Sequence, residues 1–542
     1  METLKQISGN IVDLVNDRIY PGTLVIKDGK IADIIREESE YRNYLLPGLI
    51  DAHVHIESSM LVPAEFARLA VTHGTVAVVS DPHEIANVLG IDGVRYMIEN
   101  GQKVPFKFYF GVPACVPATG FETAGAELNA AQIEELFQKD GLFFLSEMMN
   151  YPGVLNSNPE VMAKIGIARK YHKPIDGHAP GLSGEELKKY IQAGITTDHE
   201  AFQLEEGLAK IKAGMKILIR EGSAAKNFEE LHGLIPQYSD YCMFCCDDKH
   251  PNDLVQGHIN DLVKMALAKG YDKLKVLKCA TVNPVKHYGL EVGLLQKGDP
   301  ADLIIIDGFE KFTILATYIN GVIVAKDGES LIPKVKTRAI NKFKVKPKNP
   351  NDFKVKHYEK EIDLIEVVDG ELVTNRLRVT PKVEDGYLKS DPERDLLKIT
   401  VVNRYRDVSP AVALIKNFGL KQGAIASSVA HDSHNIVAVG VSDDDLARAV
   451  NLIIKNEGGL AIVGDCFEDL LPLPVAGLMS IEDGYQVAEG YRRIAAKAKM
   501  LGSRLKDPFM TMSFMTLLVI PELKISDRGL FDGLKFEFVI ES

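Results

Sequence analysis

The sequence predicts an α/β protein in which a central (β/α)8 barrel of the TIM type is accompanied by a small β domain and a C-terminal α+β domain. Three observations predict this arrangement. Eight short apolar runs alternate with helical-looking stretches in the centre, two β-rich segments flank that centre, and a second apolar pattern begins after a polar segment. At 542 residues, 46% of them hydrophobic and 25% charged, the chain is globular and too long for one ordinary core.

The small β domain is predicted from both flanks of the barrel. Residues 8–35 alternate short β-like runs with turn signals such as Asp28-Gly29, a pattern typical of hairpins. A similar pattern returns at residues 293–327. We therefore assign residues 1–45 and 291–345 to one discontinuous β domain, with the barrel, residues 46–290, inserted between its halves.

The barrel is predicted because strands that alternate with helices favour parallel β-α units, and eight such units can close on themselves. The carboxyl ends of barrel strands form the active-site face, so polar residues at those ends should meet at one mouth. The eight runs are GLIDAHVHIE (48–57), TVAVVSD (75–81), KFYFGVP (107–113), LFFLSEM (142–148), KPIDGHA (173–179), TTDHEAF (196–202), KILIREGS (216–223) and YCMFCCDD (241–248).

Beyond the barrel, residues 341–362 are rich in Lys, Asn and Pro, and we interpret them as a linker. Residues 363–542 then form the predicted C-terminal domain. In it, residues 443–456 begin with acidic residues and carry Leu446, Val450 and Ile453 at helical spacing. Residues 480–499 also predict a helix.

Composition narrows the class of function. The net charge of −12 argues against nucleic-acid binding. The first residues lack a basic region followed by an apolar stretch, and no run has the apolar length of a membrane span, so a cytoplasmic protein is expected. Six cysteines in so long a chain form no disulfide framework. Cys242, Cys245 and Cys246 could form a metal knuckle, but without a second pair at zinc-finger spacing we prefer a buried strand.

The first run holds two histidines at alternate positions. His53 and His55 should emerge from the same face of a strand, together with Asp51 and Glu57. Taken alone, an H-x-H is as well explained by one histidine in the core and one past the strand end. The other polar strand ends decide between these interpretations.

Counted together, the polar strand ends form a candidate metal-ligand set. Nitrogen and oxygen donors without thiolate suit Mn, Fe or Zn. Because six ligands exceed the need of one tetrahedral ion, we expect two ions, bridged by the carboxylate of Glu147. The set consists of His53, His55, Glu147, His178, His199 and Asp247.

Alternatives remain for single members of this set. His178 could hydrogen-bond a loop instead, Glu200 could take the role of His199, and Asp248 could replace Asp247 as the ligand of the eighth strand. His83 also closes a strand, and we expect it to contact the substrate or to support a ligand.

Candidate substrate contacts come from strand ends and from one C-terminal segment, AHDSHN, which contains His431 and His434. A salt-bridge network beneath the loops would explain the strand-end residues equally well, and a polar turn would explain the C-terminal segment. Our hypothesis is that this segment folds over the barrel mouth. The candidates are Glu57, Ser58, His83, Arg220, Ser223, His431 and His434.

These motifs resemble a known group of enzymes. The order of H-x-H, a strand-four acid, two later single histidines and a strand-eight aspartate is similar to the amidohydrolase superfamily. More narrowly, the chain resembles the bacterial adenine deaminase family from residue 47 to about 534. The strings that carry this narrower resemblance are PGLIDAHVHIESSM, DPHEIANVLG, SEMMNYPGV, DGHAPGL, REGSAA, CCDDKHP, SSVAHDSHNI, LPLPVAGLMS and GLFDG.

The resemblance implies a barrel with a small β-sandwich and an extra C-terminal domain. It also implies a binuclear site, with manganese or iron as the first expectation and zinc as an alternative, that converts adenine and water to hypoxanthine and ammonia. Many superfamily members bridge their metals with a carboxylated lysine, whereas here Glu147 stands at that point. The cytidine-type deaminases use a different single-zinc pattern that this chain lacks.

For catalysis we assign proton transfer to Asp247, with Glu200 or Asp248 as alternatives. Three rival interpretations remain: an amidohydrolase acting on another heterocycle, one acting on a cyclic amide, and a barrel that serves only as a scaffold. A homodimer is expected because closed symmetric dimers are the commonest assembly.

Overall fold

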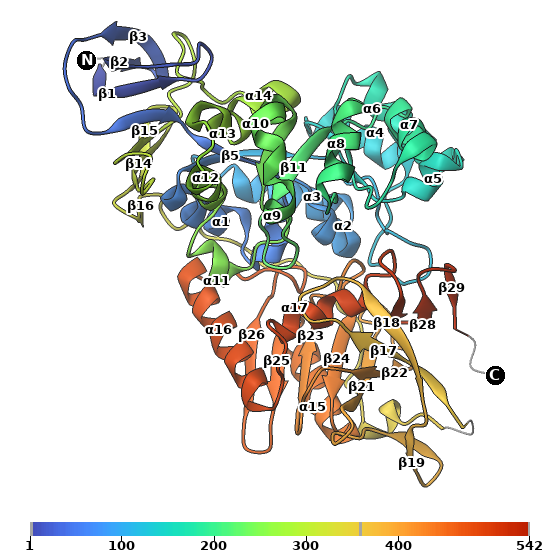
Figure 1. The fold of residues 1–542 in the computed structure, drawn as a ribbon. Coiled ribbons are helices and arrows are strands. Elements are labelled where there is room, and N and C mark those ends of the chain that lie inside the picture. The colour runs from blue at the N-terminus through green and yellow to red at the C-terminus, as the bar shows by residue number, and fades with distance from the viewer. Residues whose placement is uncertain (1–3, 357–359, 540–542) are drawn as a thin grey trace.

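The computed structural model describes residues 4–356 and 360–539. The barrel lies between a β domain and a C-terminal unit (Figure 1). Residues 1–3, 357–359 and 540–542, which belong to the predicted β domain, linker and C-terminal domain, lie outside the described residues. Among the described ranges, no helix combines the length and apolar composition needed to cross a membrane.

All eight apolar runs form strands, and strands pair in parallel within three groups, β5-β6-β7, β8-β9 and β10-β11-β12. Single bridges between Val112 and Leu145 and between Val54 and Asp247 connect the strand groups, and the second closes the eighth strand onto the first. The strands are β5 (Leu49–Val54), β6 (Thr75–Ser80), β7 (Lys107–Phe110), β8 (Leu145–Met148), β9 (Ile175–Gly177), β10 (Thr197–Asp198), β11 (Lys216–Arg220) and β12 (Cys242–Cys245).

Helices surround these strands. They are α1 (Pro63–Ala70), α2 (His83–Leu89), α3 (Ile91–Gly101), α4 (Ala130–Lys139), α5 (Tyr151–Leu155), α6 (Pro159–Lys170), α7 (Gly184–Gln192), α8 (Leu204–Lys212), α9 (Phe228–Leu231), α10 (Ile235–Tyr238), α11 (Pro251–Leu254), α12 (Ile259–Ala268), α13 (Lys273–Cys279) and α14 (Val282–Tyr288). Cys242 and Cys245 lie in the buried strand β12, which confirms the preferred interpretation of those cysteines.

Both flanks contribute to one eight-stranded sheet, in the order β16-β15-β14-β13-β4-β1-β2-β3. The parallel pairing of β1 with β4 and the antiparallel pairing of β4 with β13 join the two halves. The strands are β1 (Lys5–Asp13), β2 (Arg18–Lys27), β3 (Lys30–Arg36), β4 (Tyr44–Pro47), β13 (Leu303–Ile306), β14 (Ile314–Ile319), β15 (Val322–Lys326) and β16 (Glu329–Ser330).

The C-terminal unit is built on a second eight-stranded sheet, in the order β18-β17-β22-β21-β24-β23-β25-β26. Its strands are β17 (Ile362–Val367), β18 (Thr374–Val379), β21 (Leu396–Val402), β22 (Ala411–Lys416), β23 (Ala424–Ser427), β24 (Ile436–Gly440), β25 (Gly459–Val463) and β26 (Glu468–Pro472). The remaining elements are β19 (Lys382–Glu384), β20 (Tyr387–Lys389), α15 (Asp443–Lys455), α16 (Gly484–Met500), α17 (Pro508–Ser513), β27 (Leu523–Ser526), β28 (Gly529–Asp532) and β29 (Glu537–Phe538).

Two expectations in this region are refined by the structure. Helix α16 begins four residues later than the predicted start at Ser480, because the Ser480 amide donates to the Met60 carbonyl at 2.8 Å and the Asp483 side chain caps the helix. The described part of the predicted linker contains no α-helix and packs against the C-terminal unit. Val345 and Phe353 are buried in the same apolar cluster as residues of α15.

Candidate metal centre and active site

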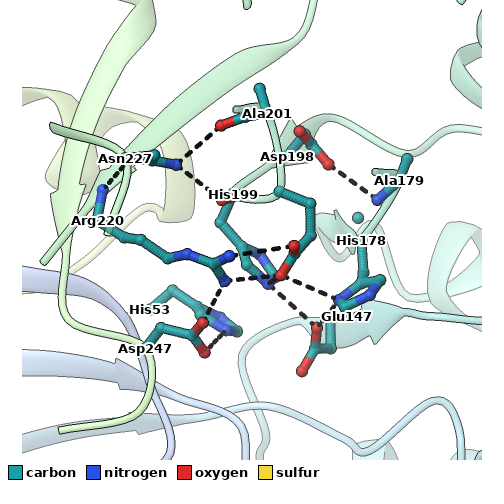
Figure 2. A network of polar contacts seen from close by, with 12 residues as sticks. His53, Glu147, His178, Ala179, Asp198, His199, Ala201, Arg220, Asn227 and Asp247 are labelled. Carbon is teal, nitrogen blue, oxygen red and sulfur yellow. Dashed lines mark hydrogen bonds and ion pairs between the residues drawn. The ribbon is translucent and has the colours of Figure 1, made fainter. Parts of the chain in front are cut away.

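The six predicted metal ligands converge at one end of the barrel. His53 and Glu147 lie within β5 and β8, and the other four follow the ends of β5, β9, β10 and β12. Because the carboxyl ends of parallel strands meet at one mouth, residues 194 positions apart in sequence become neighbours. All are buried except His178, whose side chain is 13% exposed. Figure 2 shows five of them facing one another.

Glu147 lies at the centre of this set. Its Oε1 is 3.2 Å from Nε2 of His55, while its Oε2 is 2.9 Å from Nδ1 of His178 and 3.3 Å from Nε2 of His199. The two carboxylate oxygens therefore face different histidines. This is the placement that a carboxylate bridging two cations requires.

Asp247 contacts both histidines of the H-x-H motif. Its Oδ1 lies 3.4 Å from Nε2 of His53 and 3.1 Å from Nε2 of His55. The Asp247 amide donates to the His53 carbonyl at 2.9 Å, and the His55 amide donates to the Asp247 carbonyl at 3.2 Å. The closure of the barrel thus fixes the aspartate beside the H-x-H.

The donor set fits divalent cations. Burial lowers the pKa of His53, which favours the neutral ring. Apart from the 3.4 Å contact with Asp247, its Nε2 has no hydrogen-bond partner among the described residues. Burial opposes a charge on His55, but the hydrogen bonds that it donates to Asp247 and Glu147 hold its pKa well above the ordinary range. A cation bound between these carboxylates would take the place of that proton. Imidazole and carboxylate donors without thiolate indicate divalent metal binding.

Arg220 forms an ion-pair network rather than an open contact surface. Its Nη1 donates to Glu200 Oε1 at 2.7 Å and its Nη2 to Oε2 at 3.1 Å, and Nη1 also contacts Asp247. Figure 2 shows the guanidinium reaching Asp247. Burial opposes this charge, and the two carboxylates raise the pKa of Arg220 above its ordinary value. A network of this kind was the alternative considered for the strand-end residues.

A second polar group links the barrel to the C-terminal unit. Nδ1 of His431 donates to Glu84 Oε1 at 2.7 Å, and Nε2 of His434 contacts the other oxygen of Glu84. His83 lies beside them, with Nδ1 3.1 Å from Asp81 Oδ2. The predicted segment AHDSHN therefore reaches the barrel mouth through Glu84.

These groups surround a narrow cavity of about 50 Å³. Two larger cavities, of about 590 and 240 Å³, share lining residues with it. The polar lining of the narrow cavity consists of His55, His83, Glu84, Glu147, His178, His199, Glu200, Arg220, Asp247, Asp248, His431 and Asp432. Its apolar lining consists of Met149, Ala225, Leu372, Phe514, Leu517, Val519 and Ile520.

Four candidate substrate contacts do not line this cavity, and neither does the predicted ligand His53. Glu57 accepts from the Ile85 amide at 3.2 Å, and burial raises its pKa to about 7. Ser58 donates to Asp248. Ser223 donates to Asp253 at 2.5 Å and lines the 240 Å³ cavity instead. The fourth is His434, which lies behind Glu84.

Sequence reasoning missed His258, which contacts Asp51 in the first barrel strand. Its Nε2 lies 2.9 Å from Asp51 Oδ2, and Asp51 Oδ1 accepts from the amides of His53 (3.2 Å) and Cys246 (3.1 Å). His258 follows no predicted strand, so no pattern pointed to it. Asp51 itself lay on the predicted polar face.

Comparisons with known proteins place the chain in a family. The amidohydrolase family matches residues 44–324, and the adenine deaminase C-terminal domain matches residues 371–537. An adenine deaminase of Sulfurovum sp. is 55% identical over 98% of this chain and 99% of its own length. The chain belongs to the adenine deaminases of the amidohydrolase family. Adenine deaminases of Salinibacter ruber (53% identical, 98% of both chains) and Methanosarcina mazei (52%, 99% of both) agree.

This membership confirms the resemblance inferred from the motifs and the predicted fold class. Both matched regions follow the structure: the first spans the barrel together with β4 and β13 to β15, and the second lies in the C-terminal unit. The family identity also favours a hydrolase over a scaffold, because the catalytic barrel and its donor set are both present.

Proposed function

We propose that the protein catalyses the hydrolytic deamination of adenine to hypoxanthine and ammonia. The observation that carries the proposal is the convergence of His53, His55, Glu147, His178, His199 and Asp247 in a chain of the adenine deaminase family. Adenine and water are the substrates. No feature of the site favours a cyclic amide or another heterocycle over adenine.

The proposed cofactor is a pair of divalent cations, and the carboxylate of Glu147 would help to hold both of them. Manganese or iron is preferred and zinc is the alternative, because the donors are only nitrogen and oxygen. When bound, two such ions supply a water that is acidic enough to react at neutral pH. His53 and His55 would hold the more buried ion, and His178 and His199 the other.

The work of this chain is to move protons and to orient the reactants. We assign to Asp247 the acceptance of the proton from the attacking water and its transfer toward the departing amine. Arg220 holds Asp247 and Glu200 in place. Glu200 and Asp248 are the alternative bases: both oxygens of Glu200 accept from that guanidinium, and Asp248 accepts from Ser58.

The apolar wall of the cavity comes from the C-terminal unit. The lining that it contributes, beside the metal-ligand residues, includes Phe514, Leu517, Val519 and Ile520. An apolar wall suits the flat faces of a neutral heterocycle and excludes bulk water. The C-terminal unit is therefore proposed to complete the active site.

The test is a substrate panel. Adenine, cytosine, guanine, dihydroorotate and hydantoin would be incubated with metal-loaded protein, and ammonia release or ring opening would be followed. We expect turnover of adenine with hypoxanthine as product, and an Asp247→Asn variant that retains most of its metal but loses most turnover. Turnover of a cyclic amide in place of adenine would contradict the proposal. The homodimer, the cytoplasmic location and a role in purine salvage stay predictions.

A further inference from the structure

One connection in the C-terminal unit is buried throughout. Residues 428–435 join the antiparallel strands β23 and β24, and every one of them is buried although they form a polar turn. Loops normally lie on the surface, because water satisfies their polar groups. A buried polar loop therefore needs partners inside the protein.

Protein contacts supply those partners for most of this loop. His431 and His434 are bound to Glu84, and the His431 ring stacks on Phe514 with centroids 4.6 Å apart. Asn435 donates to the Thr123 carbonyl at 3.0 Å. The loop is thus held on both sides of Asp432 by contacts to the barrel and to the C-terminal unit.

Two side-chain oxygens of the loop lack such a partner, Asp432 Oδ2 and Ser433 Oγ, and of these two residues only Asp432 lines the narrow cavity. Its side chain is 3% exposed, and its Oδ2 has no hydrogen-bond partner in residues 4–356 and 360–539. It also lines the narrow cavity that five of the six predicted metal ligands line. A buried carboxylate oxygen without a hydrogen-bond donor costs free energy. Because the Asp432 carboxylate borders a cavity, a ligand bound in that cavity could supply the missing donor.

We propose that Asp432 is a specificity-determining residue that accepts a hydrogen bond from an N–H of the imidazole half of the purine. This inference rests on the proposed function. The reacting carbon and its amino group must face the metal-ligand cluster of the barrel. Asp432 lines the same cavity from the C-terminal unit. In the proposed binding mode the far half of the ring system, which carries the imidazole N–H, lies against this carboxylate.

The proposal has a consequence for substrate choice. A free base carries an imidazole N–H, whereas a purine substituted at N9 carries none. Asp432 would therefore favour the free base over nucleosides. Specificity of this kind is strong because a site built to accept a hydrogen bond is left with an unpaired buried oxygen when the donor is missing.

The experiment compares two inhibitors in the metal-loaded protein. Purine carries the imidazole N–H and 9-methylpurine lacks it, and neither has an amino group to lose. We expect Asp432→Asn to raise the inhibition constant of purine by roughly 10- to 100-fold, as loss of a charge-assisted hydrogen bond implies, and to leave that of 9-methylpurine nearly unchanged. KM for adenine should rise by a similar factor, with kcat changed by less than about threefold.

Ser433→Ala is the matched control, because Ser433 is the neighbouring buried residue and does not line the cavity. It should alter neither inhibition constant. An equal weakening of both inhibitors by Asp432→Asn, or no change in either, would overturn the inference. Wild-type protein that fails to deaminate adenine would instead overturn the proposed function, so the two failures are distinguishable.

Discussion

Replacing Arg220 with Met should destabilise the metal-free protein strongly. The guanidinium is 1% exposed and is the shared counter-charge of Glu200 and Asp247, which it contacts through the bonds described above. Met fills similar space without charge, so the main effect is to leave two buried carboxylates unpaired. Removing one partner of a buried ion pair costs about 3–5 kcal/mol, and we expect a loss in that range.

The assay is urea unfolding of metal-free wild type and variant, followed by the same measurement after metal loading. Bound cations would supply part of the missing positive charge, so the loss should shrink when metal is present. Adding Glu200→Gln to Arg220→Met removes one of the unpaired charges and should recover part of the stability.

Arg95→Met is the matched control for this experiment. Arg95 also pairs with two carboxylates, Glu135 and Asp140, but its side chain is 34% exposed. Exposed pairs contribute about 0–1 kcal/mol, so this change should have a small effect. A metal-free Arg220→Met protein as stable as the wild type would refute the reasoning that these buried charges depend on Arg220.

Two further predictions concern the metal bridge and the acid stability. Glu147→Gln cannot bridge two cations as a carboxylate does, so bound metal should fall from two ions to about one per chain, with most activity lost. Burial, and then the neighbouring His258, lower the pKa of His73 to about 3. Because the unfolded chain binds this proton near pH 6.5, the folded state loses about 2 kcal/mol of stability between pH 8 and pH 5. His73→Asn should remove that loss, as measured by urea unfolding at both pH values.

Each of these predictions has a control. Glu134→Gln, on the outer helix α4, should keep the full metal content, and a Glu147→Gln protein with two ions and normal turnover would argue against the bridge. His172→Asn changes an exposed histidine and should leave the pH dependence of stability unaltered. Equal acid sensitivity of wild type and His73→Asn would show that His73 does not titrate as proposed.

The barrel could be predicted because its signal is local. Each strand is a short apolar run, several of the runs end in polar residues, as in TVAVVSD, and the same runs became β5 to β12. The start of α16 was less predictable. The helical pattern continues back to Ser480, but a backbone hydrogen bond from Ser480 to Met60, far away in sequence, holds that segment outside the helix.

The candidate site could be predicted for the same reason, since parallel strands bring their ends together. The partners of its side chains could not. His431 and His434 were predicted as candidates from their motif. Their contact with Glu84 spans about 350 residues of sequence, and the spacing of apolar and polar residues along the chain cannot predict a contact at that separation. Arg220 illustrates the same limit. The sequence placed an arginine at the end of a strand, but its hydrogen bonds to Glu200 and Asp247 form only when the barrel closes.

The central claim is that a two-metal site in this barrel deaminates adenine. The most direct measurement is ammonia release, together with loss of the adenine absorbance band, from protein stripped of metal and then titrated with manganese. The account predicts no activity without metal and a rise that saturates at two ions per chain. Full activity without metal, or no activity on adenine with two ions bound, would contradict it.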